Sequence, residues 1–223
     1  MNSVLGMQAE ACFEAFLKCS KIYKLLTSNL QIHDSNQTLG ELDYIVRDLK
    51  TQNVLHIELA CKFYLYDETA GISEEEKWIG PNRKDRLIDK LEKLKEQQFP
   101  LIHAPETQQK LKDLKIEIPT EQKLCLKAFL FLPIKMDRIH LPKNYNDCIV
   151  GHWIRTDDLK EDKAALYAIP HKKEWLLPLE NISEWYSFPQ IIQRIEEQLL
   201  NFKSPLIYKK TNLKIEKFFV VWW

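Results

Sequence analysis

Hydrophobic and polar residues alternate along two neighbouring stretches near the start of the chain. The first covers Leu39–Asp48 and the second Val54–Lys62, and the short polar segment 49–53 between them is typical of a hairpin loop. Because side chains along a strand point to alternate faces, one face of this predicted strand pair is apolar. The other face carries the polar and charged side chains of Glu41, Asp43, His56, Glu58 and Lys62.

The rest of the chain alternates between helical and strand patterns. We expect helices over residues 5–26, 81–98, 106–114 and 188–202, and further strands over 29–34, 124–133, 147–155, 206–210 and 213–222. The near-continuous apolar run in 124–133 predicts a strand that is buried on both faces. The predicted class is therefore α/β, with a central mixed β-sheet flanked by helices and extended by further strands in the C-terminal half. We expect one domain over 1–223, with a core in about 1–135 and a sheet extension or lobe in about 136–223.

The charged face of the strand pair has two interpretations. Charged side chains are rarely buried in a sheet without partners, so a solvent-facing surface with Lys62 paired to Asp43 or Glu58 is one explanation. The other is chemical, because the carboxylate oxygens of Asp43 and Glu58 suit Mg²⁺ and a neighbouring lysine would orient or stabilise an attacking water. The alternation itself leaves both open.

Three strings carry a resemblance to known proteins. Gly40-Glu41-x-Asp43, followed by a strand with Glu58 and Lys62, resembles the core of the PD-(D/E)xK nuclease superfamily. The longer strings GELDYIVRD at 40–48, HIELACKFYL at 56–65 and WIGPNRKDRL at 78–87 are similar to a bacterial domain-of-unknown-function family, the one numbered 1853, over most of the chain. The resemblance implies a restriction-endonuclease-like core, hydrolysis of nucleic-acid phosphodiester bonds, and Mg²⁺ or Mn²⁺ as cofactor.

The resemblance also implies roles for single residues. Asp43 and Glu58 would be catalytic and would hold the metal together with Glu10 of the first helix, while Lys62 would be the catalytic lysine. A solvated position on the helix is the other interpretation of Glu10. The chain departs from the superfamily pattern, in which one residue separates acid and lysine, because Glu58 and Lys62 are four apart and Ala60 stands where an acid is expected. The strand period of two keeps Glu58, Ala60 and Lys62 on one face.

Basic residues recur in two later stretches. In the predicted helix 81–98, for which Asn82 is the expected N-cap, Arg83, Arg86 and Lys90 lie at helical spacing, and interleaved acids make surface ion pairs one explanation. The other explanation is that these residues contact nucleic-acid phosphates, and the resemblance adds weight to it. In the final third, aromatic residues such as Trp175 interleave with lysines such as Lys172, as on single-strand-binding surfaces, although core packing explains most of these rings.

Composition narrows the function further. The chain of 223 residues has 32 basic and 32 acidic residues, so any nucleic-acid contact must come from a local basic face. Its five scattered cysteines lack a Cys-x-x-Cys pair and indicate neither a disulfide framework nor a structural zinc site. We see no signal peptide or membrane span and expect a soluble, cytoplasmic protein without a membrane partner. The predicted function is a metal-dependent nuclease, and the alternative is a catalytically inactive nucleic-acid-binding or protein-interaction domain of the same fold.

Overall fold

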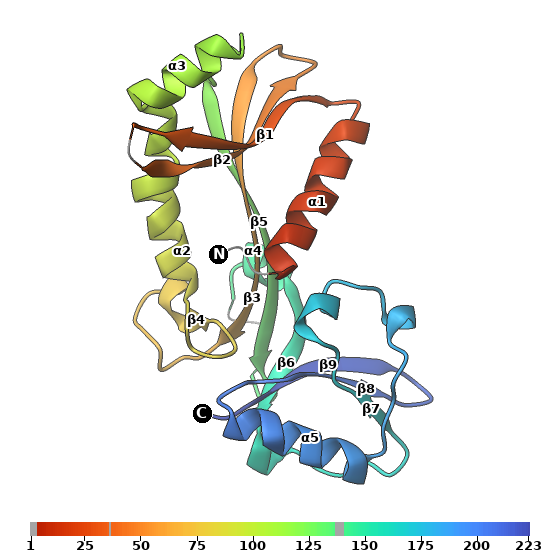
Figure 1. The fold of residues 1–223 in the computed structure, drawn as a ribbon. Coiled ribbons are helices and arrows are strands. Elements are labelled where there is room, and N and C mark those ends of the chain that lie inside the picture. Colours follow the sequence, from red (N-terminus) through yellow and green to blue (C-terminus); the bar gives the residue numbers. More distant parts are fainter. Residues whose placement is uncertain (1–3, 36, 137–140) are drawn as a thin grey trace. The chain divides into compact units, whose positions relative to one another are not determined.

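The protein is an α/β protein in which helices pack on a mixed sheet (Figure 1), which confirms the predicted class. The computed structural model describes residues 4–35, 37–136 and 141–223. Over these residues nine strands are hydrogen-bonded in the order β1-β2-β3-β5-β6-β9-β8-β7, with β4 paired to β3. The chain packs as two compact units. Unit 1 holds the chain up to Cys61 together with Asp89–Lys127, and unit 2 holds Lys62–Ile88 and the chain from Ala128 onward.

Unit 1 is built on the hairpin strands that the alternation predicts. Its elements are α1 (Val4–Cys19), β1 (Tyr23–His33), β2 (Thr38–Asp48), the first part of β3 (Val54–Tyr66), most of α2 (Leu87–Lys93), the π-helical turn η2 (Leu94–Gln98), the 3₁₀ turn η3 (Pro100–His103), α3 (Pro105–Asp113) and the first part of β5 (Glu121–Pro133). Strand β2 runs antiparallel to both β1 and β3, with Tyr44 opposite Ile57. The predicted strand pair is therefore confirmed.

Two apolar clusters hold the helices of unit 1 on its strands. Leu17 of α1 packs with Tyr44 and Val46 of β2. A second cluster joins Ile102 of η3 and Leu111 of α3 to strand residues that include Leu30, Ile32, Leu42 and Ile45. Figure 1 shows α1 and α3 on opposite sides of β1 and β2. The strands of unit 1 are thus covered by helical segments on both sides.

Unit 2 combines the remaining strands with one long helix. Its elements are the second parts of β3 and β5, β4 (Trp78–Ile79), α4 (Lys143–Asn146), β6 (Ile149–Arg155), β7 (Leu166–Ala168), α5 (Phe188–Leu200), β8 (Leu206–Lys210), β9 (Ile215–Val221), and 3₁₀ turns at Glu75–Lys77, Thr156–Asp158, Lys172–Glu174 and Leu179–Asn181. Strand β6 is parallel to β5 and to β9, whereas β8 is antiparallel to β7 and β9. This mixture of directions agrees with the predicted mixed sheet.

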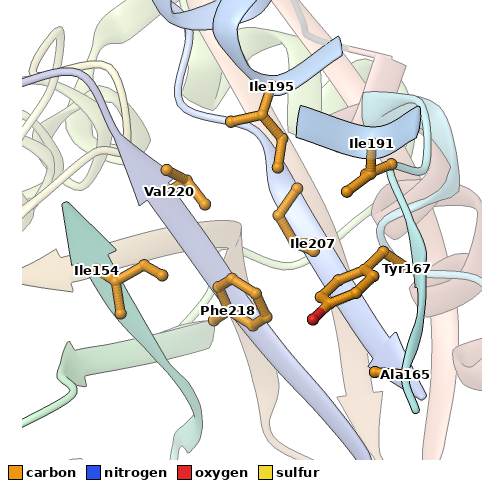
Figure 2. Close-up of a cluster of buried hydrophobic side chains, with 8 residues drawn as sticks. All are labelled: Ile154, Ala165, Tyr167, Ile191, Ile195, Ile207, Phe218 and Val220. Atoms are coloured by element: carbon orange, nitrogen blue, oxygen red, sulfur yellow. The ribbon is translucent and has the colours of Figure 1, made fainter. Parts of the chain in front are cut away.

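Helix α5 covers one face of the unit 2 strands. Ser187 and Gln190 form a capping box at its start, and apolar residues one turn apart follow. Figure 2 shows Ile191 and Ile195 of α5 directed at Ile207 and Phe218, and these side chains are all buried. Burying a large apolar side chain contributes roughly 1.5–3 kcal/mol, so this cluster is a main source of stability in unit 2.

Two predicted helices have different bounds in the structure. The first ends at Cys19 and not near Leu26, because Ser20 Oγ accepts the N–H groups of Ile22 and Tyr23 and the chain then enters β1. The second begins at Leu87 and not at Pro81. Asn82 does not cap it, since its Oδ1 accepts the Ser204 N–H at 2.8 Å.

Strand β5 is less buried than its apolar sequence predicts. Only Leu130, Phe131 and Leu132 are fully buried, while the residues before them are exposed or half-buried. The prediction of burial on both faces therefore holds for one end of the strand and is wrong for the other. Among the helices that the structure describes, none is long and apolar enough to cross a membrane.

Candidate functional site

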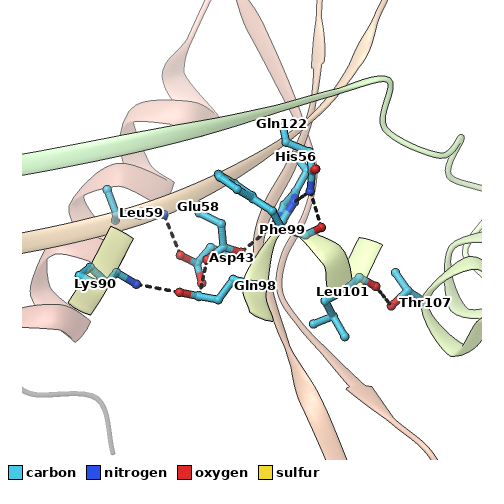
Figure 3. Close-up of polar contacts among 10 residues, drawn as sticks. All are labelled: Asp43, His56, Glu58, Leu59, Lys90, Gln98, Phe99, Leu101, Thr107 and Gln122. Carbon is cyan, nitrogen blue, oxygen red and sulfur yellow. Dashed lines mark hydrogen bonds and ion pairs between the residues drawn. The ribbon is translucent and has the colours of Figure 1, made fainter. Parts of the chain in front are cut away.

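Asp43 and Glu58 lie together on neighbouring strands of unit 1 (Figure 3). The register of β2 and β3 sets Tyr44 opposite Ile57, and carried one residue further it sets Asp43 opposite Glu58. Asp43 Oδ2 accepts the backbone N–H of Leu59 at 2.8 Å, which fixes the carboxylate against β3. The alternation of strand side chains therefore brings the two acids together as the sequence predicts.

Glu58 is fully buried, with both carboxylate oxygens hydrogen-bonded. His56 Nε2 donates to Oε1 at 2.9 Å and Gln98 Nε2 donates to Oε2 at 2.5 Å. A buried carboxylate is stable only with such partners, and these two side chains supply them. The solvent-facing interpretation of this strand face is therefore wrong at Glu58.

The hydrogen bonds around His56 assign its tautomer. Gln122 Nε2 lies 3.1 Å from His56 Nδ1 and also donates to the backbone oxygen of Phe99 at 2.8 Å. An amide NH₂ group only donates, so Nδ1 is the acceptor, and a neutral imidazole then carries its proton on Nε2. His56 thus donates to Glu58 while Gln122 holds the ring in place.

Lys90 of α2 is connected to Glu58 through Gln98. Its Nζ donates to Gln98 Oε1 at 2.8 Å, so Gln98 links the lysine of α2 to Glu58 (Figure 3). The same positive charge acts on Asp43, where it lowers the carboxyl pKa. Lys90 thus places a positive charge close to the two acids of unit 1.

The net effect on Asp43 is nevertheless a raised pKa. Burial and the negative charge of Glu58 raise the pKa of Asp43 to about 6, against the Leu59 hydrogen bond and Lys90, which lower it. Glu10 of α1 adds a smaller repulsion, and the pKa of Glu10 is itself raised, first by burial and then by Glu41. Unit 1 thus concentrates acidic groups that repel one another.

Helix α1 is fixed beside these acids by a hydrogen bond from β2. The Tyr44 hydroxyl donates to the backbone oxygen of Glu10 at 2.9 Å. Burial raises the pKa of Tyr44, so the hydroxyl keeps its proton and remains a donor. The three residues predicted as metal ligands, Glu10, Asp43 and Glu58, therefore all belong to unit 1 and interact electrostatically.

Lys62 belongs to unit 2, where its Nζ is 2.7 Å from Asp85 Oδ2. This pair takes the place of the ion pair with Asp43 or Glu58 that the surface interpretation predicts. Ala60, two residues after Glu58, is buried. The sequence thus predicts Lys62 as the lysine of the site, whereas the lysine whose charge acts on Asp43 is Lys90.

Two predicted phosphate-binding residues, Arg83 and Arg86, precede α2, so with Lys90 they do not form a stripe on one helix. Arg83 donates to Asp67 at 2.9 Å and lies 4.6 Å from the ring centroid of Trp223. Arg86 pairs with Ile79 through an isolated β-bridge. The helical basic stripe is therefore wrong as a structural prediction, because the helix starts later than expected.

Gln98 and Gln122 are the site residues that the sequence does not predict. Each lies far from β3 along the chain, and an isolated glutamine has no characteristic spacing to other site residues in the sequence. Among the described residues, no group of three or more His, Cys, Asp or Glu side chains is arranged to hold a metal ion. Any cation here would therefore need ligands beyond the protein.

The chain belongs to a protein family. The family model described as a domain of unknown function, DUF1853, matches residues 1–221 and so covers nearly the whole chain. This confirms the resemblance to family 1853. No curated protein and no solved structure matches the chain in comparisons with either collection.

Proposed function

We propose that this member of the DUF1853 family is a metal-dependent, nuclease-like protein with a restriction-endonuclease-like core, which hydrolyses phosphodiester bonds of nucleic acid at the acidic cluster of unit 1. One observation carries the proposal: Asp43 is held beside Glu58 so that their mutual repulsion contributes to an Asp43 pKa of about 6. Glu58 is in contact with the buried imidazole of His56, and the negative charge of Glu58 acts on Asp43. A divalent cation would neutralise both carboxylates.

The donor chemistry of the cluster fits Mg²⁺. Mg²⁺ prefers carboxylate oxygens and is commonly held by one or two carboxylates, with waters and substrate phosphates completing its octahedron. Asp43 and Glu58 supply that number, and Glu10 is the third acid whose charge reaches Asp43. Each Glu58 oxygen accepts one hydrogen bond, from His56 or from Gln98, and has a second lone pair that could bind a cation, provided that the cation reaches this buried side chain.

The protein groups then take separate roles. Asp43 and Glu58 would hold the cation, which when bound stabilises the charge that develops on phosphate and lowers the pKa of a water. His56 orients Glu58, and Gln98 connects it to Lys90. We assign the stabilising lysine to Lys90, because its charge acts on Asp43 while Lys62 pairs with Asp85. Lys62 remains the prediction from the sequence.

A second candidate function is supported by the burial of Glu58. Its side chain is fully buried and both of its oxygens accept hydrogen bonds, as in a polar network that serves only to stabilise a fold. A catalytically inactive domain that binds nucleic acid or protein would have this arrangement permanently.

A cleavage assay separates the two functions. Purified protein is incubated with mixed single- and double-stranded DNA and RNA in Mg²⁺ or Mn²⁺, with and without chelator. The nuclease proposal predicts chelator-sensitive cleavage that Asp43→Ala abolishes, while Asp48→Ala, an exchange elsewhere on β2, retains it. Cleavage that is absent with every substrate and metal, or that survives Asp43→Ala, would overturn the nuclease proposal.

A further inference from the structure

Unit 2 contains a large pocket made only of its own residues. The pocket has a volume of about 980 Å³ and lies among the Pro81–Asp85 loop, the 168–186 segment, the second half of α5 and the start of β8. Pockets of about 300–1,000 Å³ are typical of small-molecule sites. None of the acids of the unit 1 cluster lines it.

The wall of this pocket is rich in cations. Five of its residues are lysine or arginine: Lys84, Lys172, Lys173, Arg194 and Lys203. All five are exposed, so their charged groups are accessible to a ligand. Such a wall favours a ligand with a negatively charged group.

The four acids of the pocket wall are largely engaged within the protein. Asp85 pairs with Lys62 at 2.7 Å, and Glu174 accepts the backbone N–H of His171 at 2.8 Å. Glu184 accepts the hydroxyl of Tyr186. The fourth acid is Glu197. Asp85 is neutralised by its ion pair, so the wall has five cationic side chains against three further carboxylates and a moderate excess of positive charge.

Two aromatic rings stand beside cations in the same wall. Lys172 Nζ lies 5.8 Å from the ring centroid of Trp175, and the Arg194 guanidinium lies 4.3 Å from that of Tyr186. Each cation lies over a face of its ring, and Trp175 also packs on Phe63 and Phe219. A base can therefore contact only the part of each ring that these neighbours leave uncovered, while the adjacent cation meets its phosphate. Lys172 and Trp175, which are near neighbours in the sequence, thus line the same pocket in the fold.

From these observations we infer that the unit 2 pocket binds a phosphorylated nucleoside, either as a free nucleotide or as a unit of a single strand. The cations meet the phosphate, the rings of Trp175 and Tyr186 contact the base, and the pocket volume accommodates the whole unit. This site is independent of the acidic cluster of unit 1 and needs no metal. It would give unit 2 a binding function whether or not unit 1 cleaves nucleic acid.

The test is calorimetric binding in the presence of chelator, which excludes metal-dependent hydrolysis. Adenosine monophosphate, adenosine, inorganic phosphate and an eight-residue deoxyadenylate strand are titrated into the whole chain. We expect the monophosphate to bind at least about tenfold more tightly than adenosine or phosphate alone, because it engages cations and rings together. Binding of the strand, in competition with the monophosphate, identifies a strand as the source. A strand that does not bind identifies a free nucleotide.

Variants then locate the bound ligand. The double variant Lys172→Ala/Lys173→Ala and the single variant Arg194→Ala should each weaken monophosphate binding about tenfold. The matched control Lys160→Ala/Lys163→Ala removes two exposed lysines of unit 2 outside the pocket and should leave binding unchanged. Thermal unfolding verifies that each variant is folded. Absence of monophosphate binding at millimolar concentration, or equal binding by folded pocket variants and wild type, would overturn the inference.

Discussion

His56 and Glu58, two residues apart on β3, form a hydrogen bond of 2.9 Å between side chains that are both fully buried. Strand alternation places both on the same side of β3. Gln122 fixes the ring from one side and Gln98 fixes the carboxylate from the other. Burial of this acid therefore depends on partners from three segments, and the contribution of each is measurable.

Replacing His56 should destabilise the protein. His56→Leu removes the donor to Glu58 Oε1 and leaves a buried carboxylate oxygen without that hydrogen bond, which costs about 1–3 kcal/mol in the free energy of unfolding. In the double variant His56→Leu/Glu58→Met, the loss should be smaller than the sum of the two single losses, because the buried carboxylate that His56→Leu leaves without its donor is absent from the double variant. Urea unfolding of all four proteins measures this coupling, and strictly additive losses would contradict it.

The raised pKa of Asp43 gives a pH dependence of stability. The folded protein binds this proton with a pKa of about 6, above the unfolded value of about 3.9. Protonated Asp43 therefore adds to the free energy of unfolding. This contribution is fully present below about pH 4 and is lost as the pH rises through 6. Asp43→Asn keeps an oxygen that accepts the Leu59 N–H. Because the amide does not ionise, the variant does not lose stability as the pH rises.

We accordingly expect Asp43→Asn to be more stable than wild type at pH 7, by up to about 3 kcal/mol, and the advantage to vanish near pH 4. Asp48→Asn is the control on the same strand. Backbone hydrogen bonds from Thr51 and Lys50 lower the pKa of Asp48, so its replacement should reduce stability above pH 4. Urea unfolding from pH 4 to 8 tests both signs. An Asp43→Asn variant that gains nothing between pH 4 and 7 would contradict the assigned pKa.

The sequence predicts Lys62 as the active lysine, whereas the geometry favours Lys90. If the nuclease proposal holds, Lys90→Ala should reduce the cleavage rate at least about tenfold and leave Mn²⁺ binding detectable, because an ammonium group stabilises charge without binding the metal. Lys62→Ala removes a half-exposed ion pair with Asp85 and should change stability by at most about 1 kcal/mol. Single-turnover cleavage by both variants decides between them. A larger loss of cleavage rate in Lys62→Ala than in Lys90→Ala would show that Lys62 is the lysine that stabilises the charge.

Arg83 should act on stability and not on nucleic-acid binding. It donates to Asp67, a buried acid whose pKa is lowered, because hydrogen bonds from Thr69 and Arg83 outweigh the effect of burial. Arg83→Ala should therefore lower the free energy of unfolding by about 1–3 kcal/mol. Lys93→Ala, an exposed change on α2, is the control. If nucleic acid instead binds more weakly and with a smaller salt dependence to folded Arg83→Ala, but not to Lys93→Ala, the prediction that Arg83 contacts phosphates would be supported.

Local patterns in the sequence predict the centre of the site well. Alternation over β2 and β3 places Asp43 and Glu58 on one face, because a strand fixes side-chain direction at every residue. The start of α2 is mispredicted, since Asn82 has the chemistry of a cap but bonds to Ser204, 122 positions away in the chain. Gln98 and Gln122 are missed for the same reason, because only the folded chain brings them to Glu58 and His56.

The most direct test of the central claim is the binding of Mn²⁺ to unit 1 acids, measured by calorimetry on the wild-type protein and on Asp43→Ala/Glu58→Ala at pH 7.5, where Asp43 is ionised. If Asp43 and Glu58 hold the cation, the wild type should have one saturable site and a folded double variant should have none. Equal Mn²⁺ affinity in both proteins, or no saturable binding by the wild type, would contradict it.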